Sequence, residues 1–123
     1  MTGTAVDIVG IDLSGYMVKD GPRAIAFYRD VLGLEPVRLY PDGRGAEYEL
    51  ADGSTFGLWG GGGAVMPFQP SNGILFAVDD LDAAIAEVKA RGLAVTELET
   101  PNCRMAMIAD TEGNSVFLHK RKS

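Results

Sequence analysis

Residues 20–34 read DGPRAIAFYRDVLGL, a stretch that predicts one helix with both of its ends marked. Asp20 suits the N-cap position, and Pro22 falls in the first turn, where its missing N–H costs no hydrogen bond. Apolar side chains follow at helical spacing as far as Gly33, and a glycine at that place is typical of a helix C-terminus. We therefore expect a helix between Asp20 and Gly33.

The pattern returns about 60 residues later along the chain. Asp80 precedes Ala84-Ile85-Ala86 as Asp20 precedes Ala24-Ile25-Ala26. The turn ADGS at residues 51–54 also returns, in the longer form ADTEGNS at residues 109–115. A chain of 123 residues holds only two such copies, which excludes a solenoid because solenoids stack more repeats. The repeat indicates two paired modules with a site between them.

The composition is that of one globular domain spanning residues 1–123, with 46% hydrophobic residues. The first module is expected at about residues 5–60 and the second at residues 73–120. Four consecutive glycines begin the stretch 60–72, which we interpret as a linker between them.

Each module is predicted to have the order βαβββ, so the fold class is α+β. The second helix is expected from Asp80 to Gly92. The strands are expected at Val6–Val18, Glu35–Tyr40, Gly45–Leu50, Ser54–Trp59, Gly73–Val78, Ala94–Leu98, Arg104–Ala109 and Ser115–His119.

Charge and composition exclude several function classes. The formal net charge of −6 disfavours nucleic acid as a partner, although it would attract a cationic ligand. No apolar run approaches the roughly 20 residues that span a bilayer, and residues 1–7 do not read as a signal peptide. Cys103 is the only cysteine, which excludes an internal disulfide framework. We expect a cytoplasmic protein with no membrane partner.

Three motifs, together covering nearly the whole chain, resemble the vicinal oxygen chelate superfamily. They are AFYRDVLGL at residues 26–34, FAVDDLDAA at residues 76–84, and the turn from Asp110 to Asn114. That superfamily includes glyoxalase I, extradiol dioxygenases and bleomycin resistance proteins. The resemblance implies that the two modules form a cupped, incompletely closed, mixed sheet of eight strands.

The resemblance also implies where a metal would bind. Metal-dependent members carry four ligands, usually two His and two Glu, one on each of four strands. Counting from the motifs places these ligands at Leu13, Gly57, Gly73 and Phe117. Zinc, iron and similar ions need imidazole, carboxylate or thiolate donors, which none of these side chains supplies. The sequence therefore predicts no metal and no other cofactor.

Candidate ligand-binding residues follow from their positions around this cup. Trp59 shares a strand face with Gly57 and suits stacking against a planar ligand, but it could equally be a core or interface residue. The glycine-rich loop could close over the cup through Met66 and Phe68. The predicted ligand-binding set is Leu13, Tyr48, Gly57, Trp59, Phe68, Gly73, Leu75, Met105, Phe117 and His119.

His119 is the only histidine and a candidate for acid–base catalysis, as are Glu47 and Glu49 if they act as a carboxylate pair. An exposed residue at a strand end is the alternative interpretation. Glu47 and Glu49 share one strand face, which is either solvated or an acidic wall of the cup.

Three functions remain open from the sequence. The first is the binding of a partly planar, cationic molecule. It is suggested by the resemblance to the bleomycin-resistance branch, whose members form homodimers that sequester a drug without metal. The second is a glyoxalase-like lyase or isomerase, or a dioxygenase-like enzyme, with a displaced site made from Asp12, Glu47, Glu49 and His119. The third is a regulatory module whose cup is a dimer interface. We favour the first.

Overall fold

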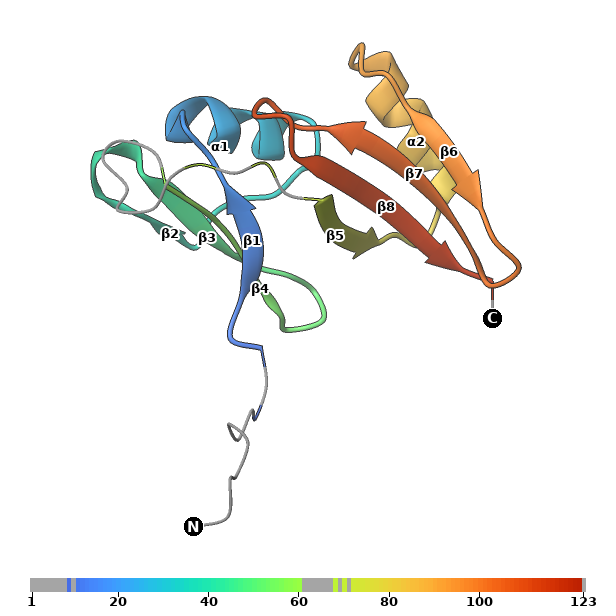
Figure 1. The fold of residues 1–123 in the computed structure, drawn as a ribbon, viewed down its shortest axis with the longest axis horizontal. Coiled ribbons are helices and arrows are strands. Elements are labelled where there is room, and N and C mark those ends of the chain that lie inside the picture. Colours follow the sequence, from blue (N-terminus) through green and yellow to red (C-terminus); the bar gives the residue numbers. More distant parts are fainter. Residues whose placement is uncertain (1–8, 10, 61–67, 69, 71, 123) are drawn as a thin grey trace.

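The structure, a computed structural model, describes residues 9, 11–60, 68, 70 and 72–122 (Figure 1). The predicted linker 60–72 lies largely outside these residues. The first module comprises β1 (Ser14–Met17), α1 (Gly21–Asp30), β2 (Arg38–Leu39), β3 (Gly45–Glu49) and β4 (Thr55–Trp59), with a short 3-10 helix, η1, at Pro41–Gly43. The second comprises β5 (Asn72–Ala77), α2 (Leu81–Ala90), β6 (Thr96–Glu99), β7 (Cys103–Ala109) and β8 (Ser115–Arg121). The α+β class and the βαβββ order of both modules are confirmed.

The helix ends follow the sequence signals. The side chain of Asp20 accepts a hydrogen bond from the backbone N–H of Arg23 at 3.1 Å, and that of Asp80 accepts one from Ala83 at 3.0 Å. Gly33 and Gly92, just beyond the two helices, have φ angles of 70° and 84°, which a residue with a Cβ rarely adopts. The two predicted N-caps, Asp20 and Asp80, are confirmed, whereas the helices end at Asp30 and Ala90, a few residues before the predicted glycines.

The eight strands form two four-stranded mixed sheets, ordered β1-β4-β3-β2 and β5-β8-β7-β6 (Figure 1). Among the described residues no strand pairing joins the two sheets. The Tyr16 hydroxyl occupies the junction instead: it accepts a hydrogen bond from the backbone N–H of Ile74 at 2.9 Å and donates one to the carbonyl of Ser115 at 2.8 Å. A side chain therefore links the modules where a strand ladder would otherwise run.

Two strands are shorter than predicted. The first begins at Ser14, which pairs with Phe56, one residue after the start of β4 at Thr55. Continuing this register, only Leu13 would still face a β4 residue, and residues 6–8 and 10 of the predicted strand lie outside the described residues. Likewise β2 keeps only the two residues that pair with β3. Strand length is set here by the partner strand rather than by local β propensity.

One hydrophobic core runs through both modules. The Phe56 ring lies 5.4 Å from the Tyr28 ring and 5.1 Å from the Phe76 ring, the latter in an edge-to-face contact between modules. Edge-to-face pairs at this separation add to the stabilisation that burial already provides.

A polar cluster on one side of the junction also holds the modules together. We call Tyr28, Asp110, Glu112 and Asn114 the junction clamp. Tyr28 donates its hydroxyl hydrogen to Asp110 Oδ2 at 2.9 Å, and Asn114 Nδ2 donates to the Met17 carbonyl at 3.0 Å. The Glu112 carboxylate accepts the backbone N–H groups of Lys19 and Asp20, both at 2.7 Å. The 110–114 turn of the second module is thus fastened to the end of β1.

The four tyrosines should make the protein sensitive to alkali. Burial raises the pKa of Tyr16, Tyr40 and Tyr48 to about 12, and burial together with the Asp110 carboxylate raises that of Tyr28 still further. Raised folded-state values mean that the stabilisation is complete below the unfolded pKa of 10.0 and is lost as the pH rises from there towards 12. Urea titrations at about pH 8.5 and about pH 11 should therefore give a markedly lower unfolding free energy at the higher pH. If the tyrosines lost their protons at the unfolded-state pKa of 10.0 while the protein stayed folded, the expectation would be contradicted.

Candidate functional site

The face of the first sheet that α1 leaves uncovered carries the residues nearest to the family's metal position. Strand pairing sets Gly15 beside Gly57 and Met17 beside Trp59, while Glu47 of β3 pairs with Gly57. We call these five residues the first face. The alternate residues of the same strands, such as Tyr16, Ala46 and Leu58, are fully buried beneath α1.

The Trp59 indole packs closely against the glycines of this face. A Cβ placed on Gly57 would stand 3.6 Å from Trp59 Cε3 and 3.3 Å from Leu13 Cδ1. A Cβ placed on Gly15 would overlap both Trp59 Cζ3 and the carbonyl oxygen of Gly57. The two glycines therefore make room for the indole, and Leu13 reaches across the place where a metal ligand would project.

The corresponding face of the second sheet is apolar. Leu75 pairs with Phe117, Met107 also pairs with Phe117, and Met105 pairs with His119. We call these residues, with Gly73, the second face. Leu75 keeps 48% of its surface exposed, and a Cβ on Gly73 would meet no atom within 4 Å. The described part of the chain leaves this face open.

The residues present do not fit the family's metal. Leu13, Gly57, Gly73 and Phe117 offer no donor atom, as the sequence predicted. The alternative set of Asp12, Glu47, Glu49 and His119 does not form a metal site either. Within the described ranges no group of three or more His, Cys, Asp or Glu side chains could hold an ion. Glu47 is instead engaged with Tyr40, whose hydroxyl donates to Glu47 Oε2 at 2.5 Å.

The structure distributes the predicted site residues unequally. Leu13, Gly57 and Trp59 lie together at the first sheet, and Gly73, Leu75, Met105, Phe117 and His119 lie together on the second face. Phe68 stands near the end of β1, with Lys19 Nζ 4.9 Å from its ring centroid, whereas Met66 lies outside the described residues. The strand neighbours of His119 are Met105 and Ala77, and neither side chain can orient an imidazole for acid–base catalysis.

Tyr48 does not belong to either face. Its side chain is 1% exposed and packs against Phe56 at a ring separation of 5.5 Å. Strand alternation puts it on the core side, opposite Glu47, so the prediction that it lines the cup is replaced by a core role. Its buried hydroxyl has no hydrogen-bond partner within the described part of the chain.

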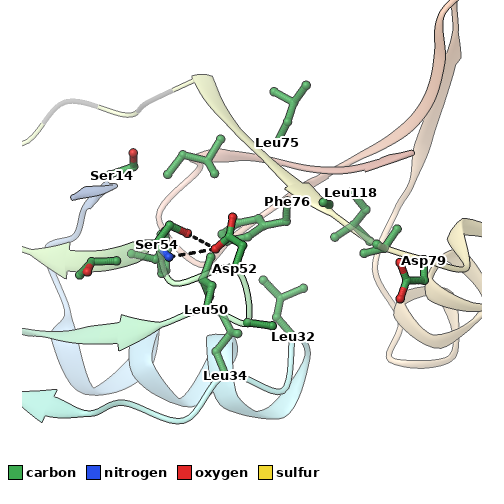
Figure 2. Close-up of a pocket in the computed structure, with 16 residues that line it drawn as sticks. Ser14, Leu32, Leu34, Leu50, Asp52, Ser54, Leu75, Phe76, Asp79 and Leu118 are labelled. Atoms are coloured by element: carbon green, nitrogen blue, oxygen red, sulfur yellow. Dashed lines mark hydrogen bonds between the residues drawn. The ribbon is translucent and has the colours of Figure 1, made fainter. Parts of the chain in front are cut away.

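Sequence reasoning missed two features of this region. Gly15 and Met17 belong to the first face, and their alternation with Tyr16 was the available signal. A cavity of about 590 Å³ also lies at the junction of the modules, and of the predicted residues it includes only Leu75 (Figure 2). The unequal lengths of the turns at 51–54 and 109–115 were the only hint of it.

Among the described residues, no helix has both the length and the apolar character needed to cross a membrane.

Comparisons with known proteins agree with this architecture. TnmS3, an antibiotic binding protein from Streptomyces sp. CB03234, is 27% identical with a TM-score of 0.75, and the match covers 96% of this chain and 100% of that one. A glyoxalase/bleomycin resistance protein from the same organism is 29% identical, with a TM-score of 0.69 over 86% of this chain and 96% of that one. Lactoylglutathione lyase from Agrobacterium tumefaciens, at 24% identity and a TM-score of 0.74 over 90% of this chain and 92% of that one, shares the fold.

No curated protein matches the chain. The model of the Glyoxalase/Bleomycin resistance protein/Dioxygenase superfamily matches residues 10–118. With the βαβββ duplication and the motifs that carry it, this match shows that the chain belongs to that superfamily.

Proposed function

We propose that this chain is a small-molecule-binding protein that sequesters a partly planar organic ligand against the first and second faces without a metal. The observation that carries the proposal is the Trp59 indole, which packs against Gly15 and Gly57, the latter one of the four positions where the family's metal ligands would stand. The ring is only partly buried, so its remaining surface is available for stacking.

The chemistry of the two faces supports ligand capture rather than catalysis. The second face provides Leu75, Met105, Met107 and Phe117, and methionine side chains adapt to ligands of varied shape. The superfamily similarity to an antibiotic binding protein points to the same class of function. Glu47 on the first face and the net charge of −6 favour a cationic ligand.

The proposal includes a homodimer in the cytoplasm. Leu13, Leu75 and Leu98 remain 38%, 48% and 44% exposed at the two uncovered sheet faces. Exposed apolar area of this kind is characteristic of interaction surfaces, and a second copy would bring a first face opposite a second face. Sedimentation at two protein concentrations, run beside the titration below, tests this part. A protein that sediments as a monomer at both concentrations would contradict the proposed homodimer.

Replacement of Trp59 should remove most of the affinity. Because Trp59 is the only tryptophan, quenching of its fluorescence reports directly on ligands that reach it. We expect a planar cationic antibiotic such as bleomycin to quench it, and Trp59→Ala, followed by calorimetry, to bind the same compound at least about tenfold more weakly, as for a buried aromatic anchor.

Trp59→Phe, which keeps a ring on the glycines, serves as the control and should retain most of the affinity. Unchanged binding in Trp59→Ala would contradict the stacking role. A stoichiometric divalent ion in protein purified without chelator, together with turnover of a glyoxalase-type substrate, would favour an enzyme instead.

A further inference from the structure

The cavity at the module junction is a second, chemically distinct space. Its first-module side includes Leu32, Leu34 and residues of the turn that runs from Leu50 to Ser54. Its second-module side consists of β5, the two residues after it (Val78 and Asp79), and Leu118 of β8 (Figure 2). The volume of about 590 Å³ falls within the roughly 300–1,000 Å³ of sites for small organic ligands.

This cavity does not belong to the site proposed above. Its deep wall is made by Phe56, Phe76 and Leu118, which lie on the helix-covered sides of the two sheets. Trp59 and Gly57 occupy the opposite side of the first sheet, because Phe56 alternates with them along β4. Apart from Leu75, which borders both, a ligand in the cavity would therefore contact a different set of side chains.

The cavity arises where the duplication has lost its symmetry. On the other side of the junction, the clamp fills the equivalent space with Tyr28 and Asp110. In the second module the position equivalent to Tyr28 by the 60-residue repeat is the core residue Val88, and a valine has no hydroxyl to donate. The 51–54 turn is also shorter than the 109–115 turn, so it has no counterpart of Glu112. The first-module turn consequently stays undocked and leaves a hollow.

The charges around the hollow are of one sign. Asp52 and Asp79 are among the lining residues, and none of the lining residues described is Lys, Arg or His. Ser54 donates its backbone N–H and its hydroxyl to Asp52 Oδ1 at 2.9 and 2.6 Å, which lowers the pKa of that carboxyl and keeps it ionised (Figure 2). Apolar walls with two carboxylates complement an apolar body that carries a positive charge.

We propose that the junction cavity binds an amphipathic organic cation, a small molecule with an apolar body and a protonated amine. The apolar body would lie among Leu32, Leu34, Leu50 and Phe76, and the ammonium group would face Asp52 and Asp79.

Three probes with one apolar body and different head groups test the proposal: phenylbutylamine, phenylbutanol and phenylbutyrate. Calorimetry should give the order amine, alcohol, carboxylate from strongest to weakest. Asp52→Asn combined with Asp79→Asn should weaken amine binding by about fivefold, the size expected for exposed charge pairs, and leave alcohol binding unchanged. Asp42→Asn combined with Glu87→Gln changes the net charge equally away from the cavity and should have little effect.

Methyl NMR of leucine-labelled protein locates the probe. Shifts at Leu32, Leu34 and Leu50, with Leu98 unaffected and the binding retained in Trp59→Ala, support the cavity. Shifts at Leu13 and Leu98 that disappear in Trp59→Ala would place the probe on the two faces and overturn this inference while leaving the proposed function intact. Equal amine affinity in the Asp52/Asp79 double variant would overturn the charge selectivity. If the amine dissociated a dimer, the hollow would be a subunit interface, and this result would also overturn the proposed amine site.

Discussion

Asp110→Ala is expected to lower the free energy of unfolding by about 3–4 kcal/mol, since it removes the acceptor at the centre of a buried polar cluster. Asp110 is 7% exposed. Its carboxylate accepts the Tyr28 hydroxyl at 2.9 Å, the backbone N–H groups of Glu112 and Asn114 at 2.8 and 3.0 Å, and Asn114 Nδ2 at 2.9 Å. An alanine satisfies none of these donors, and the Tyr28 hydroxyl would stay buried. Domains of this size are stable by only about 5–15 kcal/mol, so the loss is a large fraction of the total.

The duplicated module supplies a matched control for this prediction. Asp52 is the counterpart of Asp110 in the first module, but it is exposed, and its side-chain hydrogen bonds within the described residues are local ones, to Ser54. Asp52→Ala should therefore cost much less than Asp110→Ala in the same urea titration. Tyr28→Phe should fall between the two, because it removes one of the four bonds. Equal losses at Asp52 and Asp110 would show that the clamp contributes nothing beyond a turn.

Gly15→Ala is expected to destabilise the protein by about 2–3 kcal/mol, a typical cost of forcing an extra methyl group into packed structure. The new Cβ would overlap the carbonyl oxygen of Gly57, on the strand paired with β1, and the Trp59 ring. The side chain can move, but the backbone carbonyl cannot do so without disturbing the β1–β4 pairing. The measurement is the urea midpoint together with far-ultraviolet circular dichroism.

Two other glycines test this explanation. A Cβ on Gly57 would meet Leu13 Cδ1 at 3.3 Å, the far end of a flexible side chain, so Gly57→Ala should cost less than Gly15→Ala. Gly73→Ala should leave the unfolding free energy nearly unchanged, because its Cβ would meet no atom within 4 Å. A double variant with Trp59→Ala should not rescue Gly15→Ala, because the contact with the carbonyl remains. Full rescue would assign the strain to the indole alone.

The sequence predicted those parts of the fold that depend on local signals. Asp20 and Asp80 cap helices because a carboxylate reaches the N–H three residues on without any tertiary contact. The turn glycines and the 60-residue repeat likewise predicted the βαβββ order, because they too can be recognised without any tertiary contact. Strand ends were less predictable: β1 begins with Ser14 opposite Phe56, near the start of β4, and that limit depends on residues about 40 positions away.

The candidate site was predictable only in part. Leu13, Gly57, Gly73 and Phe117 exclude the family's usual four-ligand metal site by side-chain chemistry alone, whatever the geometry. Alternation also placed Glu47 opposite Tyr48, and applied fully it would have moved Tyr48 to the core. The position of Trp59 over Gly15 and Gly57 was hidden, because it requires the register of β1 against β4.

The sequence by itself thus determined the duplicated modules, the capped helices and the lack of donors at the family's four ligand positions, since each depends on residue chemistry or on sequence spacing. Only the tertiary structure decided how the modules meet: Tyr16 in place of a strand ladder, a clamp on one side and a cavity on the other. Those features arise from contacts such as Tyr28 with Asp110 and Tyr16 with Ser115, between residues far apart in the chain. A repeat predicts equal halves, and only packing shows where small differences between the halves leave one contact filled and its counterpart empty.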